Sequence, residues 1–254
     1  MYFRWLVILQ MNLILVLFLI LARIGEGFSV RSNNDGRKRS SLNLSRNFFS
    51  VITGLPPQAL LDEESLKDIL QTTSLQGKSL QCVYKATQNG WSATDFHDAV
   101  DDLGSGLVVA LSRSGALFGG FNPLGWRSTD DYFNSNSAFL WYSKGAKKIV
   151  KTPILQGGNA AIFDFATGGP CFGAADLQIG SPKAAVLGGF AGPSMEDVSI
   201  NAGNLKEGSS SLGYAYRALP GWPVRGRFQL VELEVYVNAE LRKEKTKLNI
   251  WPFF

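Results

Sequence analysis

Histidine and cysteine are scarce in this 254-residue chain. His97 is the only histidine. It lies beside Asp95 and Asp98 in a predicted helix, which indicates a solvent-exposed side chain. A Ser-His-Asp triad, a His-based dyad or a His-ligated metal site is therefore not expected. The two cysteines, Cys82 and Cys171, are too few for a disulfide scaffold, and no second cysteine lies near either of them to form a CxxC redox or metal motif.

Phosphate-binding glycine loops are also missing. No GxGxxG follows a predicted strand, and no GxxxxGK[ST] sequence occurs. The glycine-rich stretch 188–193 (GGFAGP) lacks the lysine and the clear helix start that a phosphate loop needs. The sequence therefore predicts no cofactor.

A basic surface is absent from the body of the chain, although the formal net charge is +4. Residues 1–47 hold seven Lys and Arg against two acids, which leaves 18 basic and 19 acidic residues in the rest. Because nucleic-acid binding needs a clustered basic face, no nucleic-acid partner is expected. The charged stretch near the end, within the tail 239–254, mixes both signs and indicates a solvated helix.

The N-terminal segment allows three interpretations. Residues 1–27 contain a long apolar run, and residues 28–55 are rich in Ser, Arg and Asn and predicted to be disordered. The first interpretation is a cleaved secretory signal. The second is a retained membrane anchor with a cytosolic domain, because the positive charges mostly follow the apolar run. The third, which we favour, is a two-part plastid-targeting leader, since transit peptides need this acid-poor composition.

The remaining sequence has the composition of a folded, β-rich domain. Hydrophobic residues make up 45% of the chain, and its 27 glycines favour turn-rich β structure over helical bundles. Apolar periodicity predicts amphipathic helices at 60–72 and 92–104. Alternating or continuous apolar runs predict strands at 80–86, 106–111, 147–153, 160–165, 177–179 and 227–237, with a long loop at 181–208. Early helices and late strands indicate an α+β fold, a sandwich of two antiparallel sheets with flanking helices.

The stretch 115–141 reads as strand, irregular loop and strand. Gly119 and Gly120 lie in its first apolar run, where they predict close sheet packing or a bulge. Trp126 is expected to anchor the loop against the core. Asp130 and Asp131 follow in the loop and are expected to cap or turn it.

Acid pairs are the remaining candidates for acid–base chemistry. They are Asp130 and Asp131, Asp164 and Asp176, and Glu232 and Glu234. The last pair projects from one face of a strand, roughly 7 Å apart, and is typical of a solvated strand face. Asp176 is expected to fix the turn 168–173 (GGPCFG) by local hydrogen bonds. None of the pairs has a catalytic signature, so we expect neither catalytic nor metal-binding residues.

The cysteines lie in different settings. Cys82 is in a predicted strand, where a small buried hydrophobic residue fits. One disulfide bridge is possible in a secreted protein, but two free, buried thiols are the preferred interpretation. Cys171 is in a Gly/Pro turn, where we expect greater exposure than for Cys82, and it is the candidate for a reactive thiol.

Several motifs, taken in order, resemble the TLDc domain. The resemblance rests on an LL-x-x-E-x-L helix at 60–70, on Gly90-Trp91-Ser92, and on an FGGF…W block at 118–126. The stretches 168–180 (GGPCFGAADLQIG), 209–216 (SSSLGYAY) and 231–237 (VELEVYV) resemble later segments of the family. The match covers 58–238, nearly all of the predicted folded part.

The resemblance implies a two-sheet sandwich and a role in protection against oxidative stress. For some members it also implies binding to the vacuolar-type proton-pumping ATPase. The family offers no established catalytic residues to carry over. The motif positions expected to act in structure or interaction are Gly119, Gly120, Trp126, Asp130, Asp131, Gly169, Phe172, Gly173, Asp176, Gly213 and Glu234.

Two functional hypotheses follow. The first is a non-enzymatic protein-interaction domain that acts in oxidative-stress protection. The second is a thiol-dependent antioxidant, or another enzyme, that uses Cys171. The chain lacks the LysM, TBC and BTB partner domains of the family and carries a hydrophobic leader. A lumenal or plastid location would separate it from the cytosolic face of the proton pump.

Overall fold

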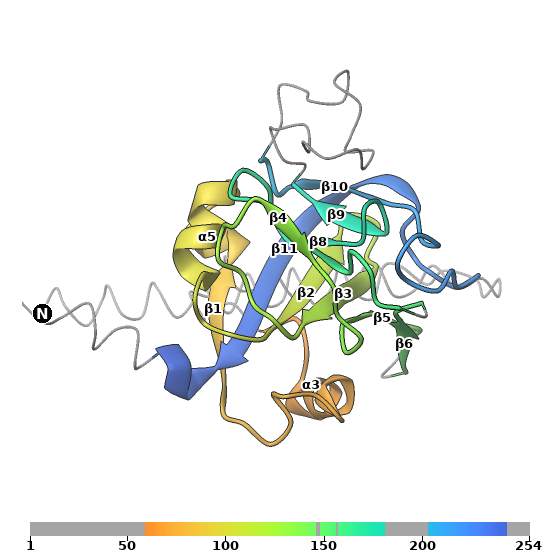
Figure 1. Cartoon of the computed structure of the whole chain (residues 1–254). Coiled ribbons are helices and arrows are strands. Elements are labelled where there is room, and N and C mark those ends of the chain that lie inside the picture. The colour runs from red at the N-terminus through yellow and green to blue at the C-terminus, as the bar shows by residue number, and fades with distance from the viewer. Residues whose placement is uncertain (1–58, 146–147, 156, 181–202, 243–254) are drawn as a thin grey trace, which may run out of the picture. The chain divides into compact units, whose positions relative to one another are not determined.

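A computed structural model of the protein describes residues 59–145, 148–155, 157–180 and 203–242 (Figure 1). The predicted leader segments 1–27 and 28–55 lie outside these residues, as does most of the tail 239–254, of which residues 239–242 are helical. No helix in the described ranges is long and apolar enough to cross a membrane.

The two predicted helices are present. Besides the helical residues 239–242, the structure has α3 (Glu63–Leu70), α4 (Ala86–Asn89) and α5 (Ala93–Val100). The side chain of Asp62 caps α3 by accepting from Ser65 N, as the sequence predicts. Ser92 caps α5 in a capping box, in which Ser92 and Asp95 bond each other's backbone N–H groups. The short α4 was not predicted.

The structure is β-rich. The strands are β1 (Leu80–Lys85), β2 (Gly106–Ser112), β3 (Leu117–Asn122), β4 (Asp131–Phe133), β5 (Phe139–Ser143), β6 (Ile149–Pro153), β7 (Ile162–Asp164), β8 (Cys171–Phe172), β9 (Leu177–Ile179), β10 (Glu207–Ser210) and β11 (Gly226–Asn238). The predicted strands all occur, with ends shifted by up to two residues. Three short strands, β4, β8 and β10, replace stretches that were predicted as loop or turn. Residues 181–202 of the predicted long loop lie outside the described ranges.

The strands form one antiparallel sheet rather than two separate ones. Its order is β4-β7-β8-β9-β10-β11-β2-β3-β5-β6, with β1 also paired to β11. The sheet curls strongly into a half-barrel, which Figure 1 shows. The prediction of a two-sheet sandwich is therefore not confirmed.

The long strand β11 connects the two parts of the curled sheet. Residues 226–229 pair with β10, whereas residues 230–237 pair with β2. The register shifts between Leu230 and Glu232, so Val231 is an extra residue at a bulge. A bulge bends its strand and increases the local twist, which fits the position of the curl.

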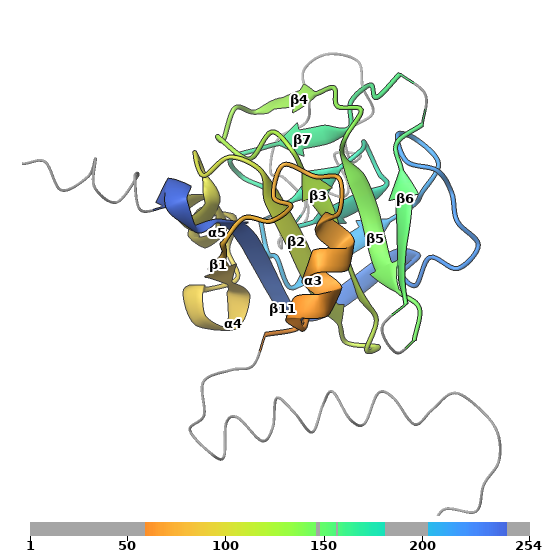
Figure 2. The same ribbon diagram turned by 90° about the horizontal axis from the view of Figure 1, so that it is seen from below.

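Side chains alternate between two apolar layers on the opposite faces of β2. Val108 and Ala110 point into the main core inside the curl. Leu107 and Val109 point the other way, into a smaller cluster under α3. Figure 2 shows α3 across this outer face of the sheet. The predicted stripe of α3, Leu66, Ile69 and Leu70, is buried there.

Candidate functional site

The two motif glycines of β3 allow close packing on opposite faces of the sheet. A β-carbon on Gly119 would overlap the carbonyl oxygen of Val108, and one on Gly120 would lie 2.6 Å from the ring of Phe172. The ladders on both sides of β3 keep their register through both glycines. The glycines therefore allow neighbouring groups to approach the backbone of β3 closely, and no bulge forms at them.

Trp126 anchors the loop that follows β3. Its ring is buried and contacts Phe96 edge-to-face, with the ring centroids 5.5 Å apart. It also lies against Gly106, where a β-carbon would approach the indole to 2.7 Å. Among the described residues, the indole N–H of Trp126 is the one buried side-chain donor or acceptor without a hydrogen-bond partner.

A buried carboxylate, Asp164, holds the loop after Trp126. Its oxygens accept hydrogen bonds from the backbone N–H groups of residues 127–129 at 3.0, 3.3 and 3.2 Å. Asp130 forms a further hydrogen bond between the same two segments, because it accepts from Ala166 N at 2.9 Å. Ser128 and Asp130 both have positive φ, +53° and +55°. Several independent bonds thus maintain a backbone conformation that is unfavourable for these residues.

Asp130 and Asp131 do not act as an acid pair. Asp131 begins β4 and accepts from Tyr132 N at 2.8 Å. In the ladder Asp131 lies opposite Asp164. Each of the two neighbouring acids therefore has its own structural partner.

His97 is buried, so the prediction of a surface histidine is wrong. Only 7% of the residue is exposed. Its Nδ1 lies 2.8 Å from Asp101 Oδ1, and its Nε2 lies 2.9 and 3.0 Å from the carbonyl oxygens of Phe165 and Gly168. The neighbours of His97 in the sequence are acidic, which indicates an exposed position. In the structure, the face of α5 that carries His97 packs against the turn 165–168.

All partners of His97 are hydrogen-bond acceptors. An imidazole can satisfy acceptors at both nitrogens only when both carry protons. Burial lowers the pKa of His97, but the hydrogen bond and the charge of Asp101, together with the carbonyl of Gly168 and the charge of Asp164, raise it above its ordinary value. The geometry thus favours a buried imidazolium.

Ser128, Asp101 and His97 contain the side chains of a catalytic triad in a different arrangement. Ser128 Oγ donates to Asp101 Oδ2 at 2.5 Å, and Asp101 contacts His97 Nδ1. In a triad the serine contacts the other ring nitrogen of the histidine. Here that nitrogen, Nε2, is hydrogen-bonded to carbonyl oxygens of the turn 165–168. The imidazole therefore does not act as a base toward Ser128.

Asp176 organises a distant loop rather than its own turn. Its carboxylate accepts backbone N–H bonds from all four residues of 213–216, at 2.8 to 3.3 Å. The prediction of local hydrogen bonds in the turn 168–173 is therefore wrong. Gly173 and Gly213 both have positive φ, +64° and +125°, and a β-carbon on Gly173 would overlap the Asp176 carboxylate.

Cys171 is a free, buried cysteine, so the expectation that it is the more exposed of the two cysteines is wrong. Only 2% of the residue is exposed, because Cys171 and Phe172 form the short strand β8 between β7 and β9. Burial raises the pKa of the Cys171 thiol to about 12. Gly169, just before it, packs against the carbonyl oxygen of Ile179. A thiol with a high pKa in this setting is a weak nucleophile at neutral pH.

Cys82 is the exposed cysteine. The sequence predicts a small buried hydrophobic residue at this position, but the residue is exposed, and its Sγ donates to the carbonyl oxygen of Tyr84 at 3.3 Å. The register of β1 changes between Cys82 and Tyr84. At this irregularity the alternation of buried and exposed side chains that the sequence predicts for the strand is interrupted.

Glu232 and Glu234 are buried, so the predicted solvated strand face is wrong. Lys85 lies between them, with its Nζ 2.5 Å from Glu234 Oε1 and 3.8 Å from Glu232 Oε2. Glu232 also accepts from the backbone N–H and hydroxyl of Thr87, at 3.1 and 2.5 Å. Glu234 accepts from Tyr236 at 2.8 Å. These bonds join β1, α4 and β11.

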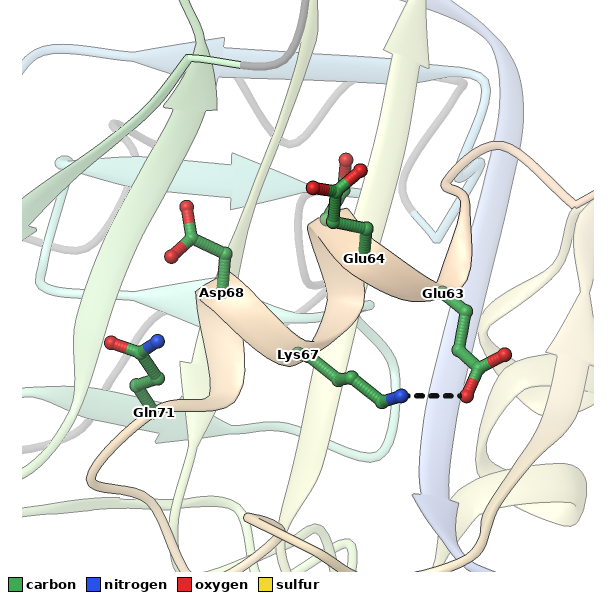
Figure 3. A pocket seen from close by; sticks show the side chains of 6 residues that line it. Glu63, Glu64, Lys67, Asp68 and Gln71 are labelled. Carbon is green, nitrogen blue, oxygen red and sulfur yellow. Dashed lines mark ion pairs between the residues drawn. The ribbon is translucent and has the colours of Figure 1, made fainter.

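One side of α3 presents an acidic face around a shallow depression. The side chains that line it are Glu63, Glu64, Ser65, Lys67, Asp68 and Gln71. In Figure 3 the labelled side chains extend outward from the helix, and Lys67 pairs with Glu63 at 2.9 Å. The lining residues described all belong to this one helix or to its C-cap, Gln71, so the depression is a solvated helix face.

No group of three or more potential metal ligands converges within the described ranges. The candidate residues are instead distributed over several structural clusters. Sequence reasoning did not identify His97, Asp101, Asp164 or Lys85 as central members of these clusters. His97 and Asp101 lie four residues apart, a spacing that could have indicated their pairing. The other partners come from distant segments, so no local pattern signals them.

The comparison with protein families matches the TLDc domain over residues 56–237. No curated protein matches the chain. The matched range contains every described strand except for the last residue of β11. The chain therefore belongs to the TLDc domain family.

Proposed function

We propose that this TLDc protein is a non-enzymatic protein-interaction domain that acts in protection against oxidative stress. The observation that supports it is the use of the buried acids as structural acceptors. Asp164 and Asp176 bind the backbone N–H groups of residues 127–129 and 213–216. Glu232 and Glu234 surround Lys85. These bonds make two irregular loops rigid, and rigid loops on a β scaffold are suited to binding.

Survival of cells that lack the protein tests this function. Full-length protein is expected to restore growth in hydrogen peroxide, and purified protein is expected not to consume peroxide. Turnover of peroxide by the purified protein would contradict the proposal if a single polar-to-apolar substitution abolished it. The substituted variant must unfold at the same temperature as the wild type.

A narrower version of the proposal is binding to a vacuolar-type proton-pumping ATPase. Family membership is its support. A pull-down with the purified full-length protein against purified pump subunits tests it directly. Binding at micromolar concentration is expected, and a pull-down without any pump subunit would exclude this partner while leaving other partners to be sought.

The compartment determines which partners the domain can reach. We propose entry into a plastid through the two-part leader, with the anchored-cytosolic and secretory routes as the alternatives. A C-terminal fluorescent fusion shows the compartment, and N-terminal sequencing of the mature protein shows whether the leader is removed. A plastid or lumenal location would exclude the pump-binding version.

The alternative function is a thiol-dependent antioxidant that uses Cys171. Burial of this thiol and its pKa of about 12 count against it. The test is stress survival with the Cys171→Ser variant, with Cys82→Ser as the matched control. Loss of protection with only the first variant, at unchanged stability, would favour the alternative.

A further inference from the structure

An irregular segment between β10 and β11 has an unusual charge composition. Residues 211–225 contain two arginines and no acidic residue. The segment leaves the sheet after β10 and returns to it at Gly226, where β11 begins. Figure 2 shows it as a blue loop beside β6.

Contacts to other elements fix the shape of this segment. Asp176 binds the N–H groups of residues 213–216. Beside β6, Arg217 N donates to Pro153 O at 3.1 Å, and Thr152 Oγ1 donates to Arg217 O at 2.6 Å. Because the backbone is already ordered, a ligand that binds the segment loses little free energy to loop ordering.

Trp222 fixes the far side of the segment. Its indole N–H donates to Ser210 Oγ at 2.8 Å. Its ring contacts Phe118 and Tyr142 edge-to-face, with centroids 5.9 and 5.8 Å away. The next residue back, Gly221, lies so close to the Tyr142 hydroxyl that a β-carbon would approach it to 2.5 Å.

The segment encloses an open groove of about 470 Å³. Apolar side chains of Leu212, Leu219, Pro220 and Trp222 line it, together with the polar residues Ser211 and Arg225. This volume lies within the usual range for ligand sites, and an apolar floor with few polar groups is typical of them.

Arginine side chains lie in and next to the lining of the groove. Arg225 donates to the carbonyl oxygens of Leu219 and Pro220, at 3.4 and 3.2 Å, which orients its guanidinium at the rim and leaves other N–H donors for a ligand. Arg217 is exposed and directly precedes the lining residue Ala218. Lys144 and Lys148 lie in the β5–β6 hairpin, whose strand β5 contributes Tyr142 to the wall behind Trp222.

None of these four cations forms an ion pair with a carboxylate of the described residues. The ion pairs found there involve Lys67, Lys85 and His97 instead. Tyr214, the most exposed large apolar side chain described, lies on the turn that Asp176 fixes, with 65% of its surface exposed. The groove thus combines unpaired positive charge with apolar surface.

We propose that this groove binds an extended acidic segment of a partner protein, with an apolar side chain placed against Leu219 and Pro220. The inference rests on the proposed protein-binding function and names the chemistry of the partner. The concave apolar floor suits a protruding side chain, whereas binding to a membrane surface uses protruding apolar groups of the protein itself. Base stacking is disfavoured, because Trp222 is buried and packs against two other rings.

Selection from a phage-displayed library of random dodecapeptides on the full-length protein tests the proposal. The expected result is enrichment of peptides that combine Asp or Glu with one large apolar residue. One enriched peptide, made with a fluorescent label, is then titrated by anisotropy. The double variant Arg217→Glu/Arg225→Glu is expected to weaken binding by about tenfold or more. The peptide with its apolar residue replaced by Ser is also expected to bind more weakly.

A charge-matched control separates the effect of contacts at the groove from the effect of the net charge of the protein on peptide affinity. Lys67→Glu/Lys78→Glu changes the net charge equally, at exposed positions on and after α3, and is expected to change the affinity less than about twofold. Equal losses in both double variants, or no enrichment of acidic peptides, would overturn the proposal. Binding to vesicles with phosphatidylserine that is lost only in the arginine variant would assign the groove to membranes instead.

A stress-survival assay separates this inference from the proposed function. If a variant no longer binds the peptide but still protects cells, the groove has no part in protection. Protection would then depend on a different interaction surface. Failure of the unchanged protein to protect cells would instead contradict the proposed function, whatever the peptide binding.

Discussion

The indole of Trp141 lies across Gly119, its cross-strand neighbour on β3. Trp141 Nε1 donates a hydrogen bond to the carbonyl oxygen of Val108 at 3.2 Å, so the ring reaches past β3 to the next strand, β2. A β-carbon on Gly119 would lie 3.1 Å from that nitrogen and would overlap the same carbonyl oxygen. The missing side chain is therefore what allows the ring to span three strands.

Substitution of Gly119 should destabilise the fold rather than remove one activity. Gly119→Ala is expected to lower the free energy of unfolding by about 1–3 kcal/mol or more, because the added β-carbon would overlap the backbone carbonyl oxygen of Val108 and the two strands must move apart. Gly119→Val is expected to unfold the domain. Urea denaturation measures both, with the exposed Ser137→Ala as the control. A folded Gly119→Val variant that has lost stress protection would show a functional surface instead.

Trp126 allows a test of its unpaired N–H group. Trp126→Ala removes a buried ring and is expected to cost about 3–5 kcal/mol. Trp126→Phe keeps most of the ring volume and also removes a buried donor that has no partner among the described residues, so its cost should be clearly smaller. Thermal unfolding of the two variants gives the comparison. Equal losses would show that the indole N–H has a partner in the folded protein.

The buried imidazolium of His97 should make stability depend on pH. Its folded pKa lies above the ordinary value of 6.5, so the folded state holds the proton more tightly than the unfolded state does. Stability from this group is fully present below pH 6.5 and is lost as the pH rises through the folded pKa. Urea unfolding between mildly acidic and mildly alkaline pH should therefore show a decline that the His97→Gln variant lacks.

The single histidine also permits a direct titration. The Cε1 proton resonance of His97 in the NMR spectrum should shift with a midpoint above 6.5. A midpoint at or below that value, or parallel stability curves for the wild type and His97→Gln, would contradict the assignment of a buried cation.

Removal of Lys85 should be costly because it leaves two carboxylates buried. Lys85→Met is expected to lower the free energy of unfolding by about 3–5 kcal/mol. The control Lys67→Met breaks an exposed pair with Glu63 and should cost about 1 kcal/mol or less. Glu234→Gln added to Lys85→Met is expected to recover part of the loss. A further loss in this double variant would show that Glu234 does not depend on Lys85 for its charge balance.

The sequence predicts structural elements well where one local pattern decides them. The helix α3 follows from Asp62 as its cap and from the stripe Leu66, Ile69 and Leu70. The continuous apolar run of β2 predicts a strand that is buried on both faces. Strands of two to four residues, such as β8, are too short to produce a periodic signal, and the pairing of their neighbours determines them.

The burial of polar residues could not be predicted in the same way. His97, Cys171 and Glu234 were assigned from their neighbours in sequence, and each assignment was wrong. His97 is covered by a turn about 70 residues later, and Glu234 is paired with Lys85 from β1. Sequence spacing within a helix or strand gives the direction of a side chain but not the element that packs over it.

The position of β11 in the chain has a consequence for synthesis on the ribosome. This strand of 13 residues lies between β10 and β2 and is also the partner of β1. Until it leaves the exit tunnel, β1 has no strand to pair with, and β2 and β10 each have one open edge. The sheet is therefore completed only when translation of the domain is nearly finished, and until then the upstream strands keep open edges of the kind that promote aggregation.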